Sequence, residues 1–373
     1  MSVFLLIVGL LLFVGLVVVH EWGHFTAARR NGVEVEEFGI GFPPRVWLKR
    51  MHSAKGDYDF TINALPLGGF VKLKGEHDSA RTPGSFGAAS LPVKIKIMLA
   101  GVAMNLGTAI VLLTLIAVLG MPQLLENQFT VKSDTKVLRH DVLVGNVEDD
   151  SPAAKAGLQA RDKLVSIGPE GQEQPLDAPE DLPGITKDHA GQTLRVTYER
   201  DGQQKQTTVS LRTTEEHQAD PTKGYLGVAP AGYTVQRSTW SAPIVALGVT
   251  KQLTVATFRG LGSAIGNLFR GQTAKASEQV AGPVGIFVVL RDGSLLGVQF
   301  VLLIIAIISL TLAIMNVLPI PALDGGRLFV TLIFHAVRKP LSKKTEERIH
   351  GTGFALLMIL FVLITIVDVR RFF

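Results

Sequence analysis

The stretch "VVVHEWGHFTAARR", residues 17–30, places two histidines and a glutamate at the end of an apolar run. His20, Glu21 and His24 form the pattern H-E-x-x-H, which puts both imidazoles on one face of a helix, one turn apart. Imidazoles in this arrangement can bind a single Zn²⁺, with Glu21 beside the metal as a base. Taken alone, so short a pattern is also compatible with a solvated polar helix face.

The position of the pattern favours the metal site. At 1.5 Å per residue, His20 lies about 14 Å along a helix from the interfacial residue Arg29, which places it inside the hydrocarbon layer of a membrane. Ionisable groups left unpaired at that depth cost several kcal/mol, so intramembrane His and Glu are rare and usually functional.

The composition indicates a membrane protein. The chain has 373 residues, of which 47% are hydrophobic and 18% charged, whereas about 25% of residues in an average soluble domain are charged. Each of four apolar runs is long enough to span a bilayer, and they lie near residues 2–19, 95–119, 296–318 and 353–367. A cleaved signal peptide is the alternative for the first run, but that run lacks a basic start and a small-residue cleavage site.

Charge and cysteine content narrow the possibilities further. The net charge is +5, but the basic residues lie mainly in the segments that link apolar runs rather than in one patch, so they indicate topology rather than nucleic-acid binding. The positive-inside rule puts the segment between the first and second runs and the segment between the third and fourth runs in the cytoplasm, with the N-terminus, the polar middle and the C-terminus outside. Since the chain has no cysteine, a zinc site must use His, Asp or Glu.

A third ligand is needed, because catalytic zinc usually has three protein ligands. The best candidate is Asp324, in the stretch "IMNVLPIPALDGGR" at residues 314–327. Pro319 and Pro321 end any helix, and extended backbone at membrane depth is tolerated only where it lines a cavity. The alternative is that Asp324 merely caps or turns the chain at the cytoplasmic interface.

The two motifs together resemble the site-2 protease family of zinc intramembrane proteases, and within it the bacterial RseP-like group. The resemblance implies that His20, His24 and Asp324 bind Zn²⁺, that Glu21 is the catalytic acid and base, and that Asn316 contacts the substrate carbonyl or oxyanion. It further implies a multi-pass protein of the bacterial inner membrane that cleaves single-pass membrane proteins, such as anti-sigma factors, and remnant signal peptides.

Two β-prone runs lie between the first two apolar runs, at residues 34–47 and 58–73. They resemble the family's membrane re-entrant β-hairpin, whose open edge can pair with an unwound substrate. The alternative is a cytoplasmic hairpin without a substrate role. The substrate-binding residues expected from this resemblance are Gly39, Gly41, Phe42, Gly68 and Gly69.

The polar middle of the chain resembles a PDZ domain of the bacterial permuted kind, through residues 144–168 and the stretch "GYLGV" at residues 224–228. Its carboxylate-binding loop would comprise Gly224, Tyr225, Leu226 and Gly227, and would take peptide C-termini. Arg161 replaces a usual glycine, so we expect the turn there to be made without the positive φ that glycine allows. The alternative role is a steric filter against substrates with bulky outer domains.

The sequence therefore predicts a multi-pass α-helical membrane protein with four transmembrane helices, a membrane re-entrant β-hairpin and one extracytoplasmic α+β PDZ domain. Its expected segments are a first transmembrane helix at 1–30, a cytoplasmic-side loop with the hairpin at 31–94, a second transmembrane helix at 95–120, the PDZ domain at 121–232, an amphipathic membrane-surface helix and linker at 233–295, a third transmembrane helix at 296–318, the Asp324 segment and cytoplasmic loop at 319–350, and a fourth transmembrane helix with the C-terminus at 351–373.

Two functions are compatible with these features. The first is a zinc endopeptidase that cuts transmembrane segments, with the lipid bilayer, single-pass substrates and peptide C-termini as partners and no nucleic acid. The second is a catalytically silent membrane scaffold whose PDZ domain binds exposed C-termini and which would tolerate loss of Glu21. We expect Asn105 to hydrogen-bond a neighbouring helix, and the histidines outside the H-E-x-x-H pattern to lie on the surface.

Overall fold

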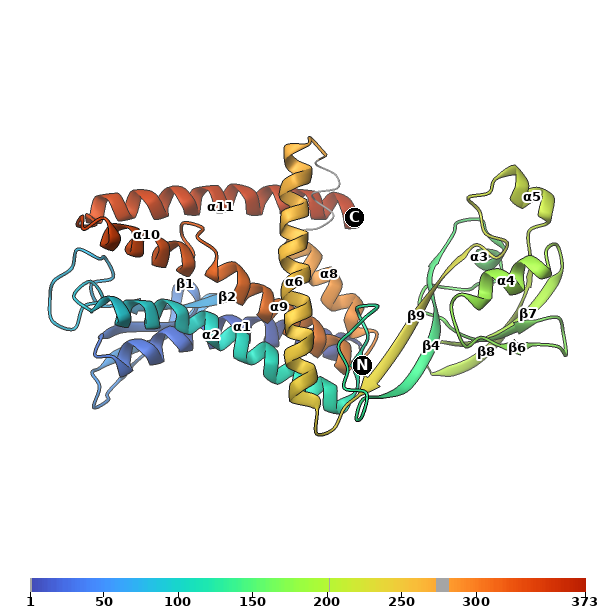
Figure 1. Ribbon diagram of the computed structural model, residues 1–373, viewed down its shortest axis with the longest axis horizontal. Coiled ribbons are helices and arrows are strands. Elements are labelled where there is room, and N and C mark those ends of the chain that lie inside the picture. Colours follow the sequence, from blue (N-terminus) through green and yellow to red (C-terminus); the bar gives the residue numbers. More distant parts are fainter. Residues whose placement is uncertain (1, 201, 273–281) are drawn as a thin grey trace. The chain divides into compact units, whose positions relative to one another are not determined.

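The computed structural model describes residues 2–200, 202–272 and 282–373. The chain forms two compact units, shown in Figure 1. One unit comprises residues 1–119, 129–131 and 240–373, and the other comprises residues 120–128 and 132–239. The first unit is mainly helical and the second is rich in strands.

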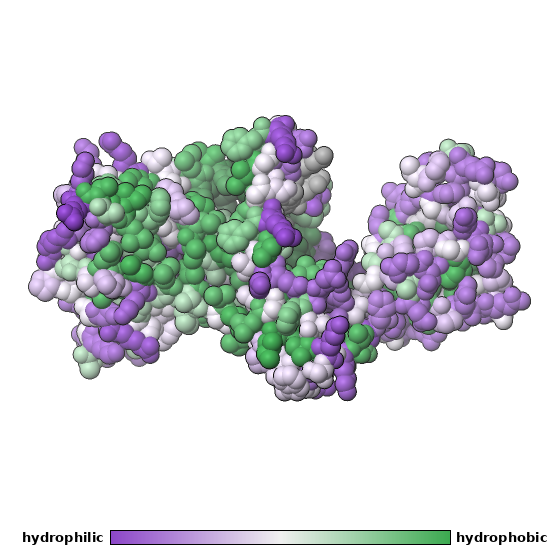
Figure 2. All heavy atoms as spheres, viewed as in Figure 1, coloured by the Kyte–Doolittle hydropathy of each residue, from purple (hydrophilic) through white to green (hydrophobic). Residues whose placement is uncertain are grey.

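Four helices of the first unit are long and apolar enough to cross a membrane. This confirms the four expected spans, which are α1 (Ser2–Arg30), α2 (Leu91–Leu119), α9 (Val298–Val317) and α11 (Lys343–Phe372). Figure 2 shows that apolar side chains cover much of the visible surface of this unit. For a bilayer-embedded unit such exposed apolar surface faces lipid rather than water.

Helix α2 is the central helix of this unit, since it packs against α1, α9 and α6 (Ala242–Phe269). Its approach to α1 is very close: a Cβ atom on Gly23 would lie 2.6 Å from the carbonyl oxygen of Ala100. Small residues at such a crossing let two backbones meet, which is the usual basis of helix association in membranes.

Helix α6 runs crosswise to α1, α2 and α9 in Figure 1 and is not among the four candidate spans. Its buried side chains are short, and they include Ala242, Val245, Ala246 and Val249. Residues 273–281, part of the expected linker, lie outside the described residues.

Two helices were not predicted from the sequence, α8 (Pro283–Ser294) and α10 (Asp324–Ala336). Helix α8 falls in the expected linker and packs against α1, α9 and α11. The buried carboxylate of Asp368 accepts hydrogen bonds from the backbone amides of Gly282 and Gly285, so α11 caps the first turn of α8. Both helices are short, and tertiary contacts rather than local periodicity favour them.

A small sheet covers part of α1. Its strands are β1 (Val35–Met51) and β2 (Tyr58–Leu73), each of which bends so that different parts pair separately. Residues 35–40 pair with residues 69–73 on one side, and residues 37–40 pair with residues 59–62 on the other. Residues 69–73 pair with β1 alone among the described strands, which leaves their other edge open beside α1.

The second unit contains a seven-stranded sheet in the order β3-β9-β4-β5-β7-β8, with β6 paired to β5. Its elements are β3 (Met121–Pro122), β4 (Lys136–Val147), α3 (Pro152–Lys155), β5 (Lys163–Gly168), β6 (Gln174–Pro175), α4 (Asp181–Asp188), β7 (Thr193–Arg200), β8 (Gln203–Ser210), α5 (Thr214–Ala219) and β9 (Val228–Arg237). Strand β9 continues past the expected boundary at residue 232, because its whole length pairs with β4.

The core of this unit consists of branched apolar side chains from the sheet, including Val142, Leu164, Ile167 and Leu194. The expectation about Arg161 is wrong: the residue itself adopts a left-handed conformation, with φ +74°. The turn it makes precedes Asp162, whose buried carboxylate is held by Arg200 at 2.6 Å.

Candidate metal centre

Three side chains from distant parts of the chain meet inside the helical unit. The Nε2 atoms of His20 and His24 lie 3.1 Å apart, and Oδ2 of Asp324 lies 3.0 Å from the first and 3.2 Å from the second. His20 is buried, with 7% of its surface exposed. The two histidines come from consecutive turns of α1, and Asp324 is the first residue of α10.

The turn before α10 brings Asp324 to this place. Helix α9 ends at Val317, and the chain then folds back so tightly that a Cβ atom on Gly325 would meet the carbonyl oxygens of Val317 and Leu318. Gly326 packs as closely against the backbone of Ile320. Only glycine, which has no Cβ, fits both positions, so the paired glycines determine where the carboxylate lies.

Helix α2 contacts both imidazoles through Ile97 and Asn105, which lie two turns apart on one face. The Nδ1 atom of His24 lies 2.8 Å from the carbonyl oxygen of Ile97, and the side-chain amide of Asn105 lies 3.3 Å from Nδ1 of His20. Between them, a Cβ atom on Gly101 would lie 2.5 Å from Nε2 of His24 and 2.7 Å from Nε2 of His20. Sequence reasoning missed Gly101, although Gly and Asn four residues apart within an apolar run indicate a shared helix face.

Glu21 faces the sheet rather than lipid. The backbone amide of Val71 approaches its carboxylate, and a Cβ atom on Gly69 would lie 3.5 Å from its Cγ. Next to it, a Cβ atom on Gly68 would lie 3.1 Å from the ring of Phe42, which is 44% exposed. The open edge of β2 thus borders the candidate base.

The other residues of this unit that are expected from the sequence lie in the bend of β1 and at the end of α9. Gly39 packs against the ring of Phe70, and Gly41, with φ +78°, approaches the carbonyl oxygen of Leu65, so both shape the bend of β1. Asn316 lies half-buried in the last turn of α9.

The loop expected to bind peptide, residues 224–227, lies in the second unit, before β9. Backbone amides of Glu148, Ala153 and Arg212 donate to the carbonyl oxygens of Gly227, Leu226 and Tyr225, respectively, and the Arg212 guanidinium donates to that of Gly224. These bonds fix the loop in front of β9, with Gly227 at φ +75°.

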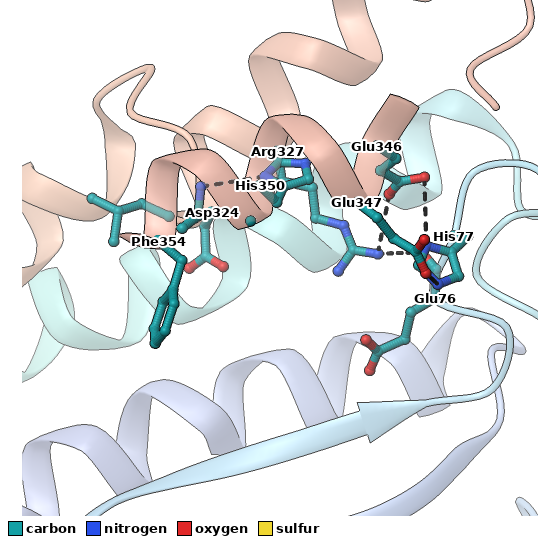
Figure 3. Close-up of a pocket in the computed structure, with 11 residues that line it drawn as sticks. Glu76, His77, Asp324, Arg327, Glu346, Glu347, His350 and Phe354 are labelled. Atoms are coloured by element: carbon teal, nitrogen blue, oxygen red, sulfur yellow. Dashed lines mark hydrogen bonds and ion pairs between the residues drawn. The ribbon is translucent and has the colours of Figure 1, made fainter. Parts of the chain in front are cut away.

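A cavity of about 460 Å³ opens beside Asp324. Figure 3 shows the side chains that line it. The guanidinium of Arg327 lies at its wall, where it donates to the backbone carbonyl of Glu76 and lies 3.9 Å from the buried carboxylate of Glu346. A second cavity of about 140 Å³ is lined by Glu21, His24, Asp324 and Arg327 together with apolar side chains. Two of the candidate ligands, His24 and Asp324, and the candidate base Glu21 therefore border these cavities.

The prediction that the remaining histidines lie on the surface is wrong for His350. Its Nδ1 atom accepts a hydrogen bond from the backbone amide of Ala322, and its Nε2 atom is buried, with no partner among the described residues. His350 thus links α11 to the turn that carries Asp324. Ala322 adopts φ +81°, a conformation unusual for a residue with a Cβ.

The donor set fits zinc. Two imidazole nitrogens and one carboxylate oxygen are ligands that zinc commonly takes, and three protein ligands leave one position open. Tetrahedral ligands at zinc bond lengths lie roughly 3.3–3.6 Å apart. The observed separations of 3.0–3.2 Å need to widen by only a few tenths of an ångström.

Comparisons with known proteins agree with this donor set. The model of the family described as "Peptidase family M50" matches residues 8–360. A Clostridium acetobutylicum protein named as a zinc metalloprotease is 32% identical, over 99% of this chain and 98% of the relative. The zinc metalloproteases RasP of Shouchella clausii and Oceanobacillus iheyensis are 27% and 26% identical, over 96% and 98% of this chain and 97% and 98% of the relatives, respectively.

Proposed function

The chain belongs to peptidase family M50 and is a site-2-type zinc metalloprotease, and from this premise we propose that it hydrolyses peptide bonds within transmembrane segments of single-pass membrane proteins. One observation carries the proposal: two of the three candidate ligands, His20 and His24, lie within α1, an apolar helix long enough to span a membrane, and Asp324 meets them there. A protease of soluble substrates has no need for a centre at that depth, where ionisable groups are costly.

In this proposal His20, His24 and Asp324 hold the zinc. When bound, Zn²⁺ acts as a Lewis acid, which makes water nucleophilic at neutral pH and polarises a peptide carbonyl. The chain supplies a pocket that excludes lipid from these ligands, since the cavities of about 460 and 140 Å³ beside them are lined partly by charged side chains. These cavities offer water a way to a site that lipid otherwise surrounds.

Glu21 is the proposed acid and base. It follows His20 directly and borders the smaller cavity, so its carboxylate can take a proton from the attacking water. The same carboxyl group then returns the proton to the leaving amine. Asn316 is proposed to donate its side-chain amide to the substrate carbonyl, from the last turn of α9 before the Asp324 segment.

A helical substrate must unwind before it is cut, because its carbonyls are hydrogen-bonded and its side chains shield the backbone. We assign the presentation of the unwound segment to the free edge of β2 at residues 69–73. An added strand there would run past Glu21, since Gly69 and Val71 border that carboxylate. Gly41 of β1 and Gly68 of β2, both with positive φ, allow the sharp bends of these two strands.

The second unit is proposed to be an extracytoplasmic PDZ domain. Its loop at residues 224–227 precedes β9, and the side of β9 away from β4 pairs only with β3, at residues 235–236, among the described strands. The remaining edge could take a peptide C-terminus as an added strand. The alternative role, a size filter, needs no bound peptide.

The proposed location is the bacterial inner membrane, with the N-terminus and the second unit outside and both basic linking segments in the cytoplasm. Lysines and arginines between positions 29 and 96 and between positions 327 and 348 support this topology, because such residues accumulate in cytoplasmic loops.

Co-expression with a tagged single-pass protein whose outer domain has been trimmed tests the proposal. Wild type and the control Glu170→Gln, a surface change in the second unit, should produce a shortened substrate band, whereas Glu21→Gln should not. Identical substrate bands for wild type and Glu21→Gln would refute proteolysis and favour the silent scaffold. Zinc analysis of purified Asp324→Ala tests the ligands separately, because zinc content equal to that of wild type would exclude Asp324.

A further inference from the structure

Three residues on one face of α2, at positions 97, 101 and 105, contact the imidazoles of the candidate metal centre. Ile97 offers its backbone carbonyl oxygen to Nδ1 of His24. Gly101 leaves the space in which both Nε2 atoms lie. Asn105 meets Nδ1 of His20 with its side-chain amide.

Asn105 is a buried polar residue whose backbone is held by a neighbouring helix. Its side chain is buried, with 1% exposed, and its backbone carbonyl oxygen accepts a hydrogen bond of 2.8 Å from the hydroxyl of Ser309 on α9. Its Oδ1 atom is buried and has no hydrogen-bond partner among the described residues. A buried amide oxygen without a partner costs about 1–3 kcal/mol, so it calls for a physical reason.

The proton of His20 supplies that reason. An imidazole that binds metal through Nε2 carries its proton on Nδ1 and needs an acceptor there. The carbonyl of Ile97 is such an acceptor for His24. A half-turn of the Asn105 amide exchanges its nitrogen and oxygen in nearly the same space, which gives Nδ1–H of His20 an acceptor and Oδ1 a donor at once.

We infer that Asn105 is a positioning residue whose amide oxygen holds His20 in the tautomer and orientation that bind zinc. The inference rests on the proposed centre of His20, His24 and Asp324. Asn105 acts through His20 and touches neither metal nor substrate. Because the support for His24 is a backbone carbonyl, Asn105 is the one of these two supports that a side-chain substitution can remove.

Zinc affinity of the purified full chain in detergent, measured against a series of zinc buffers, tests this inference without reference to activity. Asn105→Leu keeps the side-chain volume but removes the acceptor, and should weaken zinc binding by about 10–100-fold, as loss of an outer hydrogen bond to a metal ligand does. Asn105→Asp restores an acceptor for Nδ1–H and should stay within a few-fold of wild type. Thr108→Val, which also replaces a polar side chain of α2 by an apolar one but at a half-buried position, should leave the affinity unchanged.

If Asn105 served only in helix packing, the zinc affinities would differ from this expectation in one of two ways. Asn105→Leu would bind zinc as tightly as wild type, or Asn105→Asp would lose as much affinity as Asn105→Leu. Either result overturns the inference. If Asn105→Leu does not fold, Asn105→Asp decides, since a folded Asp variant with zinc affinity more than tenfold below wild type contradicts an acceptor role. Failure of the centre itself is distinguished by Asp324→Ala: if this variant keeps its zinc, the ligand assignment fails rather than the role of Asn105.

Discussion

Gly101→Ala adds one methyl group at the point where α2 meets both imidazoles. That Cβ atom would lie 2.5 Å from Nε2 of His24, and 2.6 and 2.7 Å from Cε1 and Nε2 of His20. Ordinary van der Waals contact begins near 3.4 Å. Since the methyl group is attached to a helix backbone packed against α1, the imidazoles are the groups that must move.

The required movement is large for a metal site. Each ring must shift by roughly 0.7–0.9 Å to reach ordinary contact, whereas ligand distances in zinc sites vary by about 0.2 Å. A misplacement near 1 Å at a catalytic centre costs on the order of 100-fold in rate. We expect Gly101→Ala to lower zinc affinity at least tenfold and proteolysis about 100-fold.

Gly107→Ala is the matched control, because Gly107 lies on the same helix and a Cβ atom there would meet nothing within 4 Å. Replacing glycine by alanine within a helix generally favours the helix by about 0.5–1 kcal/mol. The control should therefore keep its zinc and activity, with thermal stability equal to or above that of wild type. Zinc content after dialysis against a buffered zinc solution and cleavage of the trimmed substrate are measured for both variants.

The reasoning fails if Gly101→Ala binds zinc and cleaves substrate as the control does. It also fails if the two variants lose zinc equally, because the effect would then come from the loss of glycine in α2 and not from contact with the imidazoles. Gly101→Ser should be at least as impaired as Gly101→Ala, since its Cβ atom occupies the same place.

Substitutions at three further positions test other parts of the fold. Asp162→Ala leaves the Arg200 guanidinium without its buried partner and should lower the stability of the second unit by about 2 kcal/mol, measured by calorimetry of the full chain. Ala322→Gly relieves a left-handed residue that costs about 1–2 kcal/mol and should keep zinc content and raise or preserve the melting temperature, whereas Ala322→Val should lower both. Asp368→Ala removes two hydrogen bonds from the backbone amides of the N-cap and first turn of α8 and should speed hydrogen exchange across residues 283–294 several-fold; unchanged exchange would contradict the capping role.

Long periodic features were predictable from the sequence. The four spans follow from uninterrupted apolar runs, because a membrane helix must hydrogen-bond its own backbone and cover it with apolar side chains. The meeting of His20, His24 and Asp324 was predictable for a related reason. Polar groups at membrane depth need partners, and few polar groups interrupt the apolar runs of this sequence.

Features that depend on close packing were not predictable. Helix α10 begins at the very residue expected in an extended segment, because the adjacent Gly325 and Gly326 let the chain turn into a helix against the end of α9. Helix α8 depends on a carboxylate from α11 more than 80 residues further along the chain. His350 was expected on the surface, although it bonds the turn that carries Asp324.

Arg161 illustrates how a pattern can mislead about local geometry. The missing glycine suggested that the turn avoids positive φ, yet the arginine adopts φ +74°. A left-handed arginine costs about 1–2 kcal/mol, and the chain accepts that cost because the next residue, Asp162, must point inward. Its carboxylate accepts hydrogen bonds from the Arg200 guanidinium and from the backbone amide of Gln159. Global contacts therefore override the local preference.

Contacts between helices also explain the geometry of the candidate metal centre. Helix α2 carries no metal ligand, yet it determines how the two imidazoles of α1 are oriented. The H-E-x-x-H pattern fixes which atoms of α1 can bind metal, but a histidine on a helix can turn about two side-chain bonds. Ile97, Gly101 and Asn105 limit that freedom from the other side, by a carbonyl, a missing side chain and an amide. Two of these three contributions leave no chemical signature in a sequence, since one is backbone and one is the absence of an atom. A metal ligand can thus be recognised from its own residue type, whereas the residues that hold it in place become visible only when the helices are packed together.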